Sequence, residues 1–139
     1  MACCRELPYY PERHLMGATK GIIVKVIHYK DIEPKRYESE TAKNAWGRVI
    51  IGMADGANNF CMRVFELHEG GSSDLHQHDW EHEVFVHSGH GEVMIAGKTF
   101  ELSAGSVIFI PGGQEHQLKN NGKEPLIFAC VIPSGAPEL

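Results

Sequence analysis

The stretch GGSSDLHQHDWEHEVFVHSG, residues 70–89, holds a dense group of histidines in a chain of 139 residues. Three of the nine histidines, His76, His78 and His82, lie within its seven central positions. Side chains on an extended strand alternate between its two faces, so His76 and His78 point to the same side. A short turn at Asp79-Trp80 would bring His82 back toward them. Imidazoles gathered on one side are typical of a metal site.

A second stretch, GSVIFIPGGQEHQLKN at residues 105–120, supplies a fourth candidate, His116. It follows the sharp turn expected at Pro111-Gly112-Gly113 and begins a short run with strand character. Because strands far apart in sequence lie side by side in a β-barrel, His116 can join the other three. The other histidines, interpreted as surface or core residues, are His14, His28, His68, His87 and His90.

The chain from Trp46 onward alternates short β-branched and aromatic runs with Gly, Asn and Pro, which is typical of an all-β barrel or sandwich. No stretch fits a helix of normal length, and Ala96-Gly97-Lys98 predicts a tight hairpin. There is no internal repeat, so we predict one barrel over residues 45–139. The predicted strands are 48–53, 60–67, 83–87, 92–96, 98–102, 106–110, 116–119 and 126–132.

Composition excludes several classes of function. A net charge of −5 with scattered basic residues argues against a nucleic-acid surface, which needs clustered Lys and Arg. The longest apolar stretches, such as 125–133, are far shorter than the roughly 20 residues of a transmembrane helix. Glu6 and Pro8 stand where a secretion signal has an apolar run, so we predict a cytoplasmic protein. The cysteines, interpreted as free thiols, are Cys3, Cys4, Cys61 and Cys130.

Residues 1–44 are interpreted as an N-terminal extension. They contain one run with strand character, residues 21–28, between a Pro/Tyr-rich start and a charged stretch. This strand has no obvious place in a minimal barrel, and pairing with a neighbour's sheet would cover an edge that otherwise invites aggregation. We therefore predict a homodimer in which the extension packs on the partner subunit.

Both histidine stretches resemble motifs of the cupins, a family of small β-barrels whose metal site is encoded in two motifs. The second stretch matches at all motif positions, Gly105, Pro111, Gly113, His116 and Asn120. The first matches in the spacing of its histidines between the glycines at its ends, residues 70 and 89. The resemblance covers about residues 58–133 and implies a single cupin-type barrel, that is, a double-stranded β-helix or jelly roll.

The first stretch departs from the family pattern at one position, because His82 stands where most cupins have a glutamate ligand. Its string HDWEHEVFV is similar to a branch of small bacterial cupins that use four histidines. Glu81 or Glu83 remains an alternative ligand after a shift of one residue, although only His82 keeps both flanking spacings. The resemblance implies that the ligands of one metal ion are His76, His78, His82 and His116.

Four neutral imidazoles would leave the full charge of a divalent ion uncompensated, whereas a set with one glutamate cancels one unit. Imidazole binds Mn, Fe, Co, Ni, Cu and Zn alike, so the sequence does not choose among them. An octahedral ion with four protein ligands keeps two positions for substrate, water or dioxygen, whereas tetrahedral zinc would be closed. We therefore expect a catalytic divalent transition metal, with manganese or iron preferred.

Two further residues are candidates for substrate contacts. Arg63 interrupts an apolar strand and could hold a substrate carboxylate or enolate if it points inward. An outward arginine on the barrel edge is the alternative. Cys130 could line the pocket, or it could be an inert buried thiol. The apolar interior around the metal is expected to include Val84, Val86, Ile108, Ile110 and Phe128.

The sequence leaves three functions open. One is a metal-dependent enzyme acting on a small oxygenated organic molecule, either by dioxygenase-like chemistry or as a decarboxylase, lyase or isomerase. No nucleophile system, phosphate-binding loop or dinucleotide motif is present to suggest other chemistry. The second is a module that binds or senses a small molecule or the metal itself. The third is a closed structural zinc site.

Overall fold

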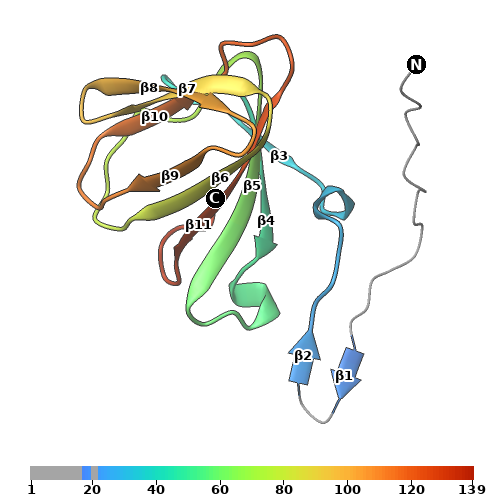
Figure 1. The fold of residues 1–139 in the computed structure, drawn as a ribbon. Coiled ribbons are helices and arrows are strands. Elements are labelled where there is room, and N and C mark those ends of the chain that lie inside the picture. Colours follow the sequence, from blue (N-terminus) through green and yellow to red (C-terminus); the bar gives the residue numbers. More distant parts are fainter. Residues whose placement is uncertain (1–16, 20–21) are drawn as a thin grey trace, which may run out of the picture.

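The structure is a computed structural model that describes residues 17–19 and 22–139 (Figure 1). Regular elements in this part of the chain are β-strands apart from two 3-10 turns, η1 (Tyr29–Asp31) and η2 (Met53–Asp55). The predicted all-β class is therefore confirmed. No helix among the described residues has the length and apolar character needed to span a bilayer. The sequence interpretations of Cys3, Cys4 and His14 fall outside the described residues.

Eleven strands occur in the described residues, in two antiparallel sheets. The bounds are β1 (Gly17–Thr19), β2 (Ile22–Val24), β3 (Lys35–Tyr37), β4 (Lys43–Ile51), β5 (Phe60–Ser72), β6 (His82–Ser88), β7 (His90–Ile95), β8 (Lys98–Ser103), β9 (Val107–Ile110), β10 (His116–Lys119) and β11 (Leu126–Pro133). β1 and β2 form a hairpin. The large sheet runs β8-β7-β10-β5-β11-β6-β9, with β4 pairing along β5 and β3 along β4.

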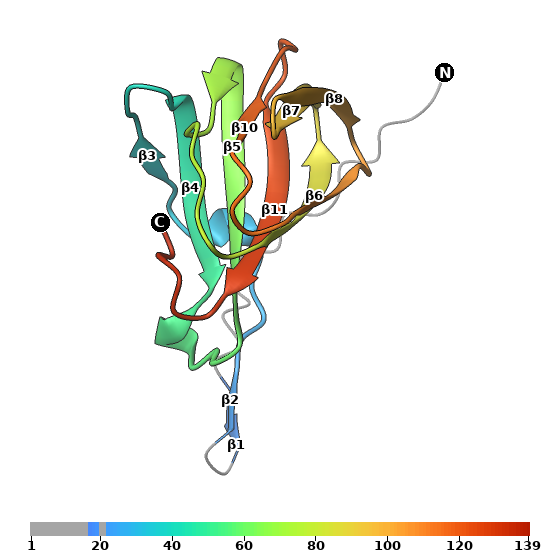
Figure 2. The ribbon, with the colours of Figure 1, turned by 90° about the vertical axis from the view of Figure 1, so that its left-hand side faces the viewer.

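The long strand β5 joins the two halves of the large sheet. Its first part pairs with β11 on one side and with β4 on the other, and Ser72 at its end pairs with Lys119 of β10. Figures 1 and 2 show the sheet curling from this strand, so that β7, β8 and β10 fold over toward β6 and β9. The result is an open barrel around one apolar core, as the sequence predicted.

Burial follows the alternation expected of strands with one inward face. In β6, the even-numbered residues from His82 to Val86 are buried and the odd-numbered residues from Glu83 to His87 are exposed. This pattern turns His82 into the barrel with the valines. The interior residues predicted from the sequence are all buried, namely Val84, Val86, Ile108, Ile110 and Phe128.

The eight strands predicted beyond residue 45 correspond in order to β4 through β11. Ala96 and Gly97 have φ angles of 50° and 77°, the left-handed conformations of a tight hairpin turn, as predicted. The largest boundary differences are at β4 and β5. β4 begins at Lys43 with a bulge at Asn44, and β5 continues past the predicted end at Leu67 through the Gly70-Gly71 pair to Ser72.

Within residues 1–44, the described part contains more than the single strand that was predicted. The predicted strand 21–28 is reduced to β2, which forms a hairpin with β1. β3 also lies here and pairs with β4 as part of the barrel sheet. The sequence Lys35-Arg36-Tyr37 sits in a charged run and becomes a strand only through this pairing, which explains why pattern analysis missed it.

Candidate metal centre

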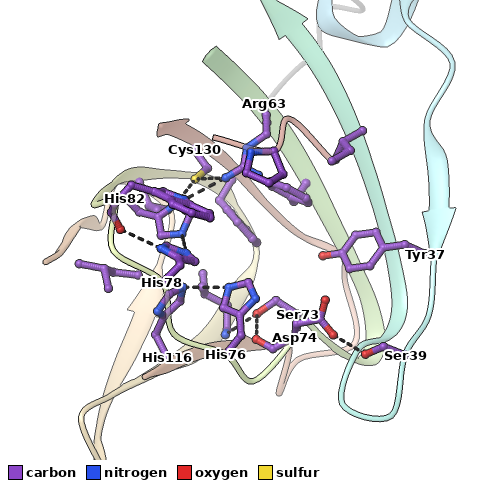
Figure 3. Close-up of a pocket in the computed structure, with 18 of the residues that line it drawn as sticks. Tyr37, Ser39, Arg63, Ser73, Asp74, His76, His78, His82, His116 and Cys130 are labelled. Carbon is purple, nitrogen blue, oxygen red and sulfur yellow. Dashed lines mark hydrogen bonds between the residues drawn. The ribbon is translucent and has the colours of Figure 1, made fainter. Parts of the chain in front are cut away.

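Four imidazoles converge inside the curled sheet (Figure 3). Their candidate ligand nitrogens all lie within 4.8 Å of one another. His76 and His78 come from the loop between β5 and β6, His82 begins β6, and His116 begins β10. The structure thus brings together the four histidines singled out in the sequence. Among the described residues, no carboxylate takes part in this cluster.

Backbone pairing places two of these histidines side by side. His76 and His116 exchange two backbone hydrogen bonds, with N···O distances of 3.2 and 2.9 Å. Residues paired in this way in an antiparallel ladder present their side chains together, and the two ring centroids are 4.7 Å apart. This single backbone pairing outside the regular strands therefore holds together two candidate ligands that are forty residues apart in sequence.

The glycine turn positions the histidine loop. The Gly113 N–H donates to the carbonyl oxygen of His78 at 2.6 Å. A Cβ atom on Gly112 would lie only 2.1 Å from the carbonyl oxygen of Asp79. The backbone of this turn thus packs directly against the backbone that carries His78, which explains why this chain needs a residue without a side chain at Gly112.

Backbone carbonyls orient two of the rings. The Nδ1 atom of His78 lies 2.8 Å from the carbonyl oxygen of Trp80, and Nδ1 of His116 lies 2.8 Å from that of Gln114. A carbonyl oxygen can only accept a hydrogen bond, so each Nδ1 carries the proton and donates it. Each Nε2 therefore keeps a free lone pair, which is the arrangement of metal-bound histidines.

The Nε2 lone pairs of His78 and His116 each face the Nε2 atom of another histidine across the cluster. The Nε2 atoms of His78 and His82 are 2.8 Å apart, and those of His76 and His116 are 3.2 Å apart. Neutral nitrogens with facing lone pairs repel each other unless a cation or a proton lies between them. The donor set therefore fits a divalent metal ion.

The charge state of the rings also fits a metal. Burial lowers the pKa of His82 to about 3, and nearby Arg63 and the other histidines add to this effect. Burial likewise lowers the pKa of His76 and His116 below the ordinary value. These imidazoles are therefore neutral at neutral pH and offer lone pairs to a metal.

We expect the metal-free protein to lose stability as the pH falls from about 6.5 toward 4. In the unfolded chain His82 takes up a proton near the ordinary value of 6.5, whereas in the folded chain it does so only near 3. A depressed folded-state pKa favours unfolding below the unfolded-state value. Thermal unfolding across this pH range should show the decline, and His82→Leu should flatten it. An equal slope in the variant would contradict this origin.

The two glutamates beside His82 are both exposed. Glu83 lies on the outward face of β6, one residue out of phase with the buried positions. Glu81 precedes the strand and also points to solvent. The structure thus gives no support to a glutamate in place of His82.

Arg63 points inward, which decides the orientation that the sequence left open, and only 8% of its surface is exposed. One guanidinium nitrogen, Nη2, lies 3.1 Å from Sγ of Cys130. The same sulfur lies 3.0 Å from Nδ1 of His82. Cys130 can thus accept a hydrogen bond from Nδ1 and direct Nε2 of His82 toward the other histidines. Burial raises the pKa of the Cys130 thiol, although Arg63 opposes this shift.

A cavity of about 690 Å³ adjoins the four histidines. Arg63 and Cys130 line it, together with aromatic residues that sequence analysis did not single out, Tyr37, Phe65 and Trp80. The Trp80 indole stacks on the His78 ring at 4.0 Å between centroids, with 4° between the planes. Sequence analysis could have identified Trp80 as a residue of the cavity, because it lies inside the histidine-rich stretch. Tyr37 could not, because β3 was not predicted.

Comparison with known proteins agrees with this architecture. The chain resembles the structure of the polyketide cyclase RemF from Streptomyces resistomycificus, with 31% identity, 83% coverage of each chain and a TM-score of 0.76. It is 35% identical over 111 residues to an oxalate-binding protein from Thermotoga maritima, covering 77% of this chain and 92% of the relative. An L-ectoine synthase from Vibrio campbellii is 24% identical over 101 residues, or 72% of this chain and 79% of that protein.

The family follows from the sequence match and the fold together. The family sequence model described as the cupin domain matches residues 63–132 of this chain, and this segment contains both histidine stretches. The solved structures that resemble the chain include a cupin 2 conserved barrel domain protein from Rhodopseudomonas palustris, with 28% identity, coverage of 75% of this chain and 71% of that chain, and a TM-score of 0.67. The chain therefore belongs to the cupin family.

Proposed function

We propose that the chain is a metal-dependent enzyme that acts on a small oxygenated organic molecule. The observation that supports this most directly is the position of four convergent imidazoles in the wall of a cavity of about 690 Å³. Pockets of this size enclose most of the surface of a small-molecule ligand. A purely structural zinc site does not require an adjoining cavity.

The metal would be one divalent ion, and manganese and iron remain the preferred candidates. When bound, it would act as a Lewis acid on substrate oxygens or support reaction with dioxygen. Its ligands would be His76, His78, His82 and His116. The chain itself supplies an apolar surround, to which Val84, Ile110 and Leu118 contribute. Such walls exclude water and strengthen electrostatic interactions with the substrate.

Besides the metal ligands, Tyr37 is a polar group positioned to bind the substrate. Figure 3 shows its hydroxyl directed from β3 toward the side of the cavity that holds the histidines. Burial, followed by the negative charge of Asp74, raises the pKa of Tyr37 above its usual range. The phenol therefore keeps its proton at neutral pH and can donate a hydrogen bond to a substrate oxygen.

For the class of reaction, we favour acid–base chemistry at a substrate carbonyl over dioxygenase-like chemistry. RemF is a polyketide cyclase and the Vibrio protein an L-ectoine synthase, and neither name is that of an oxygenase. Non-catalytic binding is the second candidate function, because the relative from Thermotoga maritima is an oxalate-binding protein.

One experiment separates these functions. The untagged protein is analysed for bound metals and then incubated with phenols, diketones and keto acids, with and without dioxygen. Product formation without dioxygen supports acid–base chemistry, and product formation coupled to oxygen uptake supports a dioxygenase. Binding of a compound without turnover by the metal-loaded protein would favour the binding module.

We further propose that the chain is a homodimer assembled through its N-terminal hairpin. The β1–β2 hairpin projects away from the barrel (Figures 1 and 2). Val24 and Val26, at its end and just beyond, are 46% and 56% exposed. An arm that leaves apolar side chains in water gains stability by packing on a partner.

The hairpin proposal predicts that replacing both Val24 and Val26 with aspartate halves the mass in solution. Light scattering should give about twice the chain mass of 15.5 kDa for the parent protein and the chain mass for the variant. Val107→Asp is the control, because Val107 is 79% exposed on β9 of the barrel itself and should leave the dimer intact. A monomeric parent protein would contradict the proposal.

A further inference from the structure

Two arginines of the barrel, Arg48 and Arg63, are equally buried, with 8% of their surface exposed. Their partners differ. Arg48 forms an ion pair with the Glu66 carboxylate, and its Nε donates to the carbonyl oxygen of Ile32 at 2.7 Å. Arg63 has no carboxylate within ion-pair distance in the described part of the chain. The two thus form a natural comparison between a paired and an unpaired buried cation.

The donors of Arg63 are incompletely used. Nη2 donates to the Cys130 sulfur at 3.1 Å and lies 3.4 Å from Nδ1 of His82, and Nη1 donates to the carbonyl oxygen of Glu138 at 3.4 Å. The buried Nε has no hydrogen-bond partner among the described residues. A guanidinium has five N–H donors, and a buried charge is costly unless a counter-charge and hydrogen bonds compensate it. Because Arg63 also lines the cavity, an anionic ligand there would supply the missing partner.

The wall beside Arg63 is aromatic. Its guanidinium lies 5.0 Å above the Phe65 ring, and Phe65 stacks on Phe128 with a centroid distance of 5.5 Å. The Tyr37 ring meets Phe65 edge-on at 6.0 Å. Aromatic walls bind flat apolar ring systems well. A two-carbon acid such as oxalate would leave most of the cavity of about 690 Å³ and this wall unused.

We propose that the cavity binds an aromatic carboxylate, with its ring against Phe65, Phe128 and Tyr37 and its anionic group paired with Arg63. This proposal rests on the enzyme function proposed above, because it names the class of substrate for the same cavity. Arg63 acts here as a substrate-binding group, since a planar guanidinium matches a carboxylate in two parallel hydrogen bonds.

The test compares an aromatic carboxylate with its neutral amide and with a dicarboxylate that has no ring. Calorimetric titration of the metal-loaded protein uses 2-naphthoate, its neutral analogue 2-naphthamide, and oxalate. We expect 2-naphthoate to bind at least tenfold more tightly than either of the others. Arg63→Met should reduce the preference for naphthoate over naphthamide to less than threefold while leaving the affinity for naphthamide unchanged. Equal preferences in the variant and the parent protein would overturn the proposal, as would tighter binding of oxalate.

Thermal unfolding separates ligand binding from a structural role. Removing an unpaired buried cation in favour of an apolar side chain does not destabilise a core, so Arg63→Met should keep or raise the melting temperature. Arg48→Met leaves Glu66 without its partner and should lower the melting temperature clearly while preserving the preference for naphthoate. If Arg63→Met destabilises the protein as much as Arg48→Met, Arg63 is structural and the proposal is wrong.

Repeating the titration after chelation of the metal separates this inference from the proposed function. The charge preference comes from Arg63, so it should persist in the metal-free protein, although both ligands bind more weakly. If the preference disappears with the metal, the carboxylate binds the metal and not Arg63, and the proposal fails. Failure of the enzyme function would instead appear as absence of turnover in the substrate screen, with the Arg63-dependent binding intact.

Discussion

Replacing His116 with alanine is expected to lower the affinity for divalent metal by more than about 100-fold, because changes in the groups that merely support a ligand already cost 10- to 100-fold. The same loss is expected for His82→Ala. Both rings present a lone pair to the cluster, and the remaining nitrogens cannot replace it. Metal content measured after dialysis should fall from about one ion per chain to a small fraction. Any metal-dependent turnover should disappear with it.

The matched control is His87→Ala, which removes a histidine from the same strand as His82. His87 is exposed on the outward face of β6 and points away from the cluster. Its variant should bind metal like the parent protein. Undiminished metal content in His116→Ala would show that the ion is held elsewhere and would contradict the four-histidine site.

Loss of the metal should change stability only modestly. The barrel buries a continuous apolar core that includes Leu67, Val86 and Ile110, so it does not depend on an ion in the way that a zinc finger does. Unfolding of the metal-free protein at neutral pH would point to a structural site and would weaken the proposal of an enzyme.

The geometry of the cluster was predictable because it depends on local patterns. The alternation of a strand places His82 in phase with Val84 and Val86, and the glycine turn before His116 sets the start of β10. These features are encoded within a few residues of each histidine. The bridge that joins His76 to His116 was not predicted, since it connects segments forty residues apart, and only the expectation of a barrel placed His116 near the other histidines.

The cavity was less predictable because its walls depend on long-range pairing. Tyr37 reaches the cavity only because β3 pairs with β4, and nothing in the charged run around it predicts a strand. Arg63 points inward because it is in phase with the buried residues Cys61, Phe65 and Leu67 of β5, a direction that becomes evident only once the sheet is assembled. Sequence alternation allowed either direction for an arginine, since an outward position would satisfy its charge at lower cost.

A second large effect is expected for Gly112→Ala. The new Cβ would lie 2.1 Å from the carbonyl oxygen of Asp79, so either the turn or the loop that carries His78 must move. The obstacle is backbone and cannot rotate away like a side chain. We expect a loss of about 3 kcal/mol in the free energy of unfolding, typical of severe overpacking. Displacement of His78 should also weaken metal binding by about 10- to 100-fold.

Gly113→Ala separates this clash from backbone strain in the same turn. Gly113 has a φ of +78°, but a Cβ there would meet open space. Its substitution should therefore cost only about 1 kcal/mol, the penalty for a left-handed residue with a side chain. The Gly113 N–H would still donate to His78, so metal affinity should stay close to that of the parent protein. Chemical denaturation and metal titration of both variants measure the two effects. If Gly113→Ala weakens metal binding as much as Gly112→Ala does, the close approach of Gly112 to Asp79 is not what positions His78.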